Sequence, residues 1–71
     1  MREIFLGNDY SIIELRRNDV FEYYVANCDA GDLLFSFGSK DRLSNIAIIN
    51  LYNSGYFDIE IERFEGGENN N

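Results

Sequence analysis

Three carboxylates near the C-terminal end of the sequence alternate with apolar residues: Asp58, Glu60 and Glu62. In a β-strand every second side chain points to the same face, so these three would form a row with a spacing of roughly 6.8 Å. A DNA strand has one phosphate per roughly 3.4 Å of axis, so the row would need neighbouring carboxylates to resemble a duplex. Glu14 and Glu22 are the candidates to supply them. The pattern predicts either a phosphate-like protein-binding surface or an ordinary solvated strand face.

The charge balance indicates what kind of partner this surface would bind. Thirteen Asp and Glu residues against six Lys and Arg give a formal net charge of -7. This charge repels nucleic acid and favours a protein partner with a basic surface. Tyr24 interrupts the apolar alternation and is a candidate contact residue beside the carboxylates. The basic pair Arg16 and Arg17 lies near Glu14 and Asp19, so local salt bridges are favoured over a phosphate site.

Catalytic and metal chemistry have little support in this sequence. It contains no His, the usual proton carrier at physiological pH, and its only cysteine, Cys28, is interpreted as structural. The turn with Asp29 and Asp32 matches no calcium loop, and the scattered glycines form no phosphate loop. We therefore expect no enzyme, no cofactor and no metal site.

Length and composition predict one compact domain over residues 1–65, followed by a disordered polar tail over residues 66–71. The chain has 71 residues, of which 45% are hydrophobic, which is enough for one small core. No apolar run approaches the roughly 20 residues of a membrane span, and the start lacks the features of a signal peptide. A cytoplasmic location is the expectation.

Turn residues at 7–9, 17–19 and 29–32 divide the first half into four predicted strands. Phe5, Tyr24 and Leu34 break the alternation. The residues expected to face a common core are Ile4, Leu6, Ile13, Leu15, Phe21, Tyr23, Val25, Leu33, Phe35 and Phe37.

The second half predicts one helix over residues 41–53, with Ser39 or Asp41 as its cap and Gly55 as its stop. The alternation over residues 57–62 predicts a fifth strand. The expected fold is a small two-layer α+β domain in the order ββββαβ, with an antiparallel sheet and one helix packed on one face.

The predicted helix has apolar residues on two sides, and one sheet cannot cover both. Ile48, Ile49 and Tyr52 lie opposite the predicted core-facing side. Either loops cover them or they form the seam of a homodimer.

These observations favour a small acidic protein-binding module, an inhibitor that blocks the nucleic-acid-binding surface of a basic partner such as a nucleic-acid-processing enzyme. In size and charge the chain resembles the anti-CRISPR and anti-restriction proteins of phages and mobile elements, although no motif carries residue roles over. The alternative is a structural or regulatory homodimer without nucleic-acid mimicry, in which the acidity maintains solubility.

Overall fold

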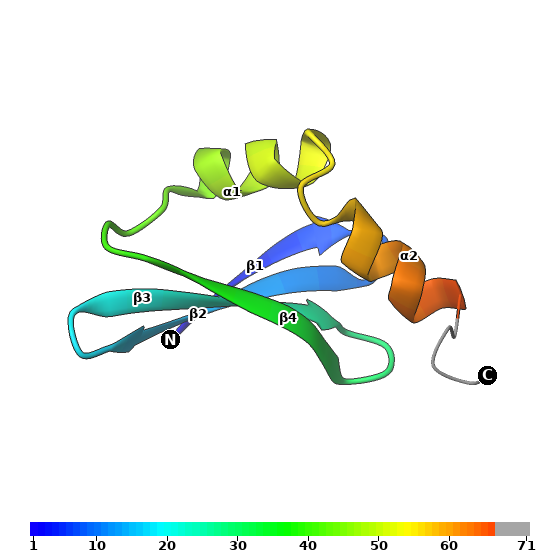
Figure 1. Cartoon of the computed structure of the whole chain (residues 1–71), viewed down its shortest axis with the longest axis horizontal. Helices are drawn as coiled ribbons and strands as arrows, with labels where there is room; N and C mark the ends of the chain where they lie inside the picture. Colours follow the sequence, from blue (N-terminus) through cyan, green and yellow to red (C-terminus); the bar gives the residue numbers. More distant parts are fainter. Residues whose placement is uncertain (67–71) are drawn as a thin grey trace.

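The computed structural model describes residues 1–66, which form a four-stranded antiparallel sheet and two helices (Figure 1). The strands lie in the order β1-β2-β3-β4. Their bounds are β1 (Arg2–Gly7), β2 (Tyr10–Arg17), β3 (Val20–Asn27) and β4 (Asp32–Ser39), and the helices are α1 (Asn45–Asn53) and α2 (Asp58–Gly66). The predicted small α+β domain with an antiparallel sheet is confirmed. Of the predicted tail, Gly66 is the last residue of α2 and the other residues lie outside the described chain.

Two tight turns build the meander. Asn8 and Asp9 join β1 to β2, Asn18 and Asp19 join β2 to β3, and all four residues have positive φ angles between 52° and 68°. Two consecutive left-handed residues are the geometry of the type I′ hairpin, whose twist matches that of the strands it joins. Asn and Asp tolerate this conformation better than other non-glycine residues, which explains why the turn positions could be predicted from sequence.

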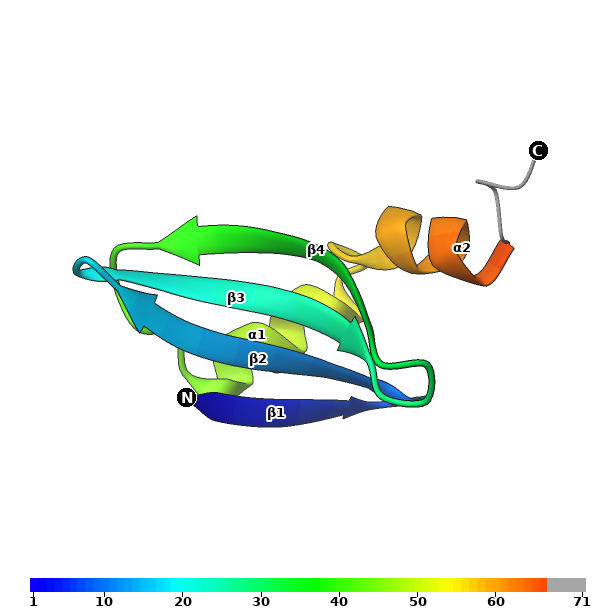
Figure 2. The same cartoon turned by 90° about the horizontal axis from the view of Figure 1, so that it is seen from below.

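The core lies between one face of the sheet and the two helices: α1 lies across this face, and α2 packs on its β4 side, at one end of the sheet (Figures 1 and 2). Ile12, Tyr23 and Val25 of the sheet are buried beneath Ile48 of α1 and Phe57, which immediately precedes α2. Aromatic rings join the layers. The fully buried residues form the centre, and β4 and the helices add half-buried residues around it, including Phe35, Phe37, Leu51, Tyr52 and Ile61.

Strand β2 presents the opposite face from the one predicted. Ile12 faces the core, whereas Ile13 and Leu15 face away from the helices. Adjacent isoleucines make the alternation compatible with either face, and the turn at residues 8–9 decides the register by placing Ile12 opposite Ile4. Leu33 was also assigned to the wrong face, because the pairing of β3 with β4 shifts between Val25 and Ala26.

The predicted fifth strand over residues 57–62 is wrong, and so is the order ββββαβ with a single helix. This segment forms the start of α2. Phe57, Ile61 and Phe64 recur at helical spacing and are buried or half-buried, whereas Ile59 is 67% exposed. Acidic residues in the first turn and Arg63 in the last turn also suit the helix dipole.

Helix α1 is shorter than predicted at its N-terminal end. Ser44 is its N-cap, in place of the predicted Ser39 or Asp41, and the Ser44 hydroxyl accepts a 3.1 Å hydrogen bond from the Ala47 backbone N–H. The predicted stop at Gly55 is confirmed by its φ of 89°, which is unfavourable for any residue with a Cβ.

Candidate protein-binding surfaces

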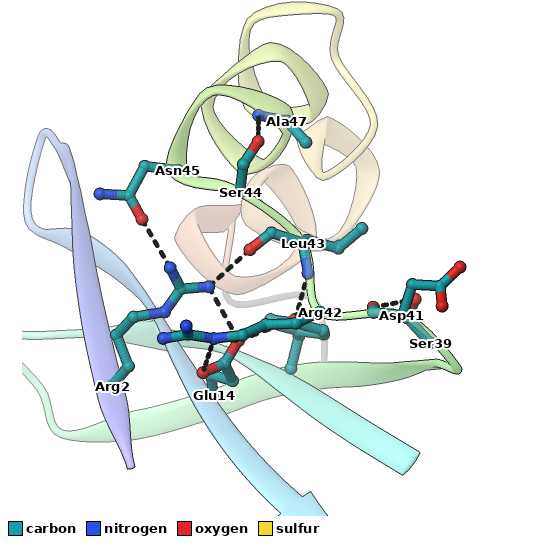
Figure 3. A network of polar contacts seen from close by, with 10 residues as sticks. Arg2, Glu14, Ser39, Asp41, Arg42, Leu43, Ser44, Asn45 and Ala47 are labelled. Carbon is teal, nitrogen blue, oxygen red and sulfur yellow. Dashed lines mark hydrogen bonds and ion pairs between the residues drawn. The ribbon is translucent and has the colours of Figure 1, made fainter. Parts of the chain in front are cut away.

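Glu14 is buried, so the structure contradicts its predicted place on an exposed acidic face. Its carboxylate accepts hydrogen bonds from Arg2 Nη2 at 2.8 Å, from the Tyr23 hydroxyl at 2.8 Å and from Arg42 Nε at 3.2 Å (Figure 3). Burial by itself raises the pKa of the Glu14 carboxyl, but the hydrogen bonds from Tyr23, Arg2 and Arg42 outweigh it and lower the pKa overall. Glu14 is therefore a buried carboxylate whose charge is balanced by Arg2 and Arg42 of the same chain.

The same network attaches the segment before α1 to the sheet. The Tyr23 hydroxyl accepts a 2.8 Å hydrogen bond from the Leu43 backbone N–H, and the Arg2 guanidinium donates to the Leu43 carbonyl at 2.6 Å and to Asn45 Oδ1 at 2.8 Å (Figure 3). Burial raises the pKa of Tyr23, and the neighbouring Glu14 carboxylate raises it further. The role of this network is structural, and sequence reasoning missed it because Glu14 occupies a core-facing position of β2.

The three carboxylates of residues 58–62 do not form a row. Side chains on a helix turn by about 100° per residue, so Asp58 and Glu62 share one side of α2 while Glu60 points to nearly the opposite side. Glu60 lies 3.7 Å from the Arg63 guanidinium. The predicted phosphate-like spacing is therefore wrong, although all three residues remain on one surface element.

Glu22 and Tyr24 lie on the sheet face that the helices leave open. The Tyr24 hydroxyl donates a 2.8 Å hydrogen bond to Glu22, and Arg17 Nε lies 3.8 Å from the same carboxylate. This hydrogen bond to Glu22 is the main cause that raises the pKa of Tyr24. The structure thus divides the predicted partner-binding set among α2, the buried network and the open face.

A different carboxylate cluster emerges from the topology, which we call the acidic end. Two turns and α2 meet there: the Cys28 backbone N–H donates to the Asp9 carbonyl at 2.7 Å, and the Tyr10 hydroxyl donates to Glu65 at 2.7 Å. Its carboxylates are Asp9, Asp29, Asp32, Asp58, Glu60, Glu62 and Glu65.

The described charge is concentrated almost entirely at this end. Seven carboxylates and one cation, Arg63, give the acidic end a net charge of -6. In the rest of the described chain five basic residues balance five acidic ones: Arg2, Arg16, Arg17, Lys40 and Arg42 against Glu3, Glu14, Asp19, Glu22 and Asp41. The single buried tyrosine at the acidic end, Tyr10, responds to its surroundings, because burial and the Glu65 carboxylate raise its pKa to about 12.

The open sheet face carries an apolar surface that no helix of residues 1–66 covers (Figure 2). Phe5 is 69% exposed and Leu33 is 58% exposed. A shallow groove of about 350 Å³ lies on this face, lined by Met1, Ile13, Leu15, Tyr24 and Leu33. Two of the three residues that broke the predicted alternation, Phe5 and Tyr24, belong to this face, whereas Leu34 packs against the core.

The predicted helix seam is contradicted at its central residue. Ile48 is fully buried in the core, and Tyr52 is half-buried against it. Ile49 is exposed at 39%, and the most exposed apolar residue of α1 is Ile46 at 72%. A dimer contact through Ile48 would require the core to open, so Ile48 is excluded from the predicted seam.

Three further features concern Cys28, metal binding and membrane insertion. Cys28 is exposed on the loop between β3 and β4. Within residues 1–66, no group of three acidic or cysteine residues is arranged to hold a metal ion. In the same range, both helices are too short to reach across a membrane.

Comparisons with protein families, curated proteins and solved structures found no match to this chain.

Proposed function

We propose that this chain is a non-enzymatic protein-binding module whose acidic end binds a basic partner protein. The observation that carries the proposal is the separation of charge along the molecule. The acidic end has a net charge of -6, whereas the rest of the described chain is neutral. An acidity that served only solubility would be expected to spread over the whole surface.

The dimensions of the molecule keep this charge separation effective in solution. The longest axis is 39 Å, about five times the Debye length of about 8 Å at physiological salt. Along β2, Arg17 lies eight residues from Asp9, or roughly 26 Å, which is more than three Debye lengths, so it screens the acidic end only weakly. A basic partner would be attracted to this end and oriented by it before contact, which accelerates association.

The charge density supports a partner that normally binds nucleic acid. The two shorter axes of the molecule are 24 Å and 18 Å, which limits the acidic end to roughly that cross-section. A duplex segment of the same 18 Å length carries about ten phosphate charges, compared with six net charges here. The acidic end reaches more than half of that charge, and it offers carboxylates from two turns and a helix in place of the predicted strand row.

We therefore propose an inhibitor that occupies the nucleic-acid-binding surface of a basic, nucleic-acid-processing enzyme, of the kind by which phages and mobile elements block host defence. The likeness to anti-CRISPR and anti-restriction proteins rests on size and charge alone. Under this proposal the protein needs no cofactor and no metal, and the bound partner is excluded from DNA or RNA by direct competition.

A pair of charge-matched variants tests the proposal. Asp58→Asn with Glu62→Gln removes two charges from the acidic end, and Asp19→Asn with Asp41→Asn removes two exposed charges from the other end. Both variants raise the net charge from -7 to -5. The native chain and both variants are immobilised and exposed to a cell extract that contains nucleic-acid-processing enzymes. Bound proteins are then eluted with duplex DNA.

The expected result is that the native chain and the control variant retain a nucleic-acid-binding protein that DNA displaces, whereas the α2 variant retains at least tenfold less. Equal retention by both variants would refute the role of the acidic end. Retention that DNA does not reduce would refute the competition with nucleic acid.

A further inference from the structure

The open sheet face is an apolar surface that the proposed function does not use. Phe5, Ile13, Tyr24 and Leu33 come from four different strands and share this face, opposite both helices (Figure 2). Residues 67–71, Gly-Glu-Asn-Asn-Asn, contain no apolar side chain. The occupant of this face must therefore bring its own apolar surface.

The charged groups on the open face already have partners within it. Glu3 accepts a 2.9 Å hydrogen bond from the Ser11 hydroxyl, and Glu22 is held by Tyr24 and Arg17. Glu22 thus has a cation within the face, whereas Glu3, on the edge strand β1, is paired only with a hydroxyl. An occupant with an apolar centre and charges only at its ends fits this surface, and the same face of a second copy has these properties.

We propose that the open face binds a second copy of this chain in a two-fold symmetric dimer. Four strands of up to eight residues cover a flat outline of roughly 19 Å by 26 Å, or about 500 Å². Two such outlines give roughly 1,000 Å² in total, which reaches the lower limit for a specific protein–protein interface. The face is thus large enough for a specific dimer.

The charge distribution selects one of the two ways in which the sheets can stack. With the two-fold axis along the strands, the two acidic ends would lie together and repel each other. With the axis across the strands, the acidic end of each copy lies over the arginine-containing end of the other. We infer the second, antiparallel arrangement, in which the strands of the two sheets remain nearly aligned.

The strand register then predicts specific contacts. The pair Ile13–Tyr24 occupies the middle of the face and is placed on the axis. Arg17 lies four residues to one side of Ile13 and Asp9 four residues to the other, so Arg17 of each copy meets Asp9 of the second copy. On β4, Leu33 is level with Ser11 and Gly38 is level with Leu15, so the two residues lie at equal distances on either side of the axis. Leu33 of each copy therefore meets the flat surface at Gly38 of the second copy.

In the same arrangement, the exposed ring of Phe5 enters the groove on the open face of the second copy. Phe5 is paired with Ser11, two residues before Ile13 on β2. A two-fold axis at Ile13 therefore places the Phe5 ring two residues beyond Ile13 on the second copy, level with Leu15. This position lies at the Met1 side of the groove. A cavity of about 150 Å³ accommodates a benzene ring, and the groove measures about 350 Å³. The contact occurs twice, once for each copy.

Oligomeric state measured by sedimentation equilibrium tests the interface. We expect the native chain to dimerise and Phe5→Glu to weaken the dimer at least tenfold, because it places a charge in the apolar groove. The matched control is Ile46→Glu, an equally drastic change at a 72% exposed position on the opposite side of the molecule. The control should dimerise like the native chain. Circular dichroism establishes that both variants are folded, and Leu33→Asp, which should also dissociate the dimer, provides a second variant on the open face.

The native cysteine reports the orientation of the two copies without any substitution. Cys28 is exposed at the acidic end, and a spin label attached to it gives the distance between the two ends. The rise per residue and the spacing of stacked sheets predict roughly 30 Å between the Cys28 positions in the antiparallel dimer and roughly 10–15 Å in the parallel one.

Three outcomes would overturn the proposed antiparallel dimer: a native chain that is monomeric at about 1 mM, a dimer that Ile46→Glu dissociates while Phe5→Glu does not, or a label distance near the shorter value. Among the carboxylates of the acidic end, this interface assigns a contact to Asp9 alone. A monomeric chain that still binds a basic partner would refute the dimer and leave the proposed function standing.

Discussion

The Tyr23 hydroxyl and the Glu14 carboxylate lie 2.8 Å apart in the layer between the sheet and α1, and both side chains are buried. Tyr23 donates this hydrogen bond and accepts another from the Leu43 backbone N–H. One sheet residue thus connects the internal carboxylate with the chain that leads into α1. These hydrogen bonds add to the packing of Ile48 in the core and help to fix the position of the first helix.

We expect Glu14→Gln to lower the free energy of unfolding by about 2–3 kcal/mol, because it leaves the buried ends of Arg2 and Tyr23 without their anion. The value is set below that of a fully buried ion pair because Arg42 and part of Arg2 are solvent-accessible. Urea unfolding at neutral pH measures it, with Glu3→Gln as the exposed control. A loss below about 0.5 kcal/mol would show that the network contributes little to stability.

The lowered pKa of Glu14 predicts an acid-sensitive stability. Its contribution is fully present above the unfolded-state pKa of about 4.5 and is lost as the pH falls through the lower pKa of the folded protein. The difference in unfolding free energy between the native chain and Glu14→Gln should therefore shrink as the pH falls from 5 toward 2. A difference that stays constant over this range would mean that Glu14 does not titrate differently in the two states.

Tyr10 predicts the opposite response in alkali. Its pKa is raised to about 12, so its contribution is present below the ordinary value of 10.0 and is lost as the pH rises through about 12. Tyr10→Phe keeps the ring but removes the titrating hydroxyl. The native chain should lose more stability than Tyr10→Phe between pH 10 and 12, measured by urea unfolding. Parallel losses would contradict the assigned pKa.

The helical form of residues 58–66 predicts that two nearby isoleucines differ in their effect. Ile61→Ala should destabilise the fold by about 1–2 kcal/mol, because Ile61 packs against the core. Ile59→Ala should change stability by less than about 0.5 kcal/mol, because Ile59 is exposed. Thermal melts of the two variants decide between helix and strand, since a strand would place both residues on one face and make the two losses similar.

The parts of the fold that could be predicted are those fixed by local chemistry. Asn8–Asp9 and Asn18–Asp19 specify their turns, and Gly55 specifies the end of α1. The prediction errors arise where one stretch of residues fits two structures, either the two faces of one strand or a strand and a helix. Ile12 and Ile13 satisfy either face of β2, and the segment after Gly55 alternates like a strand while Phe57, Ile61 and Phe64 also recur like a helix.

The candidate surfaces could be predicted less well, because they depend on which elements meet. The net acidity was visible in the sequence, but the gathering of Asp9, Asp29 and α2 at one end follows from strand pairing and from the contact between Tyr10 and Glu65. Glu14 was assigned to the surface by its charge, although three hydrogen-bond donors converge on it from separate parts of the chain. Residue type alone could not reveal those partners.

The central claim, that the acidic end binds a basic, nucleic-acid-binding partner, is tested most directly by a competition titration. The captured partner is held on a fluorescent DNA duplex, and the native chain, the Asp58→Asn/Glu62→Gln variant and the Asp19→Asn/Asp41→Asn variant are added in turn at 0.1 M and 0.5 M salt. The proposal predicts that the native chain and the second variant displace the DNA equally. The first variant should need at least tenfold more protein, a difference of about 1.4 kcal/mol that diminishes at the higher salt concentration. Equal displacement by all three proteins at both salt concentrations would contradict it.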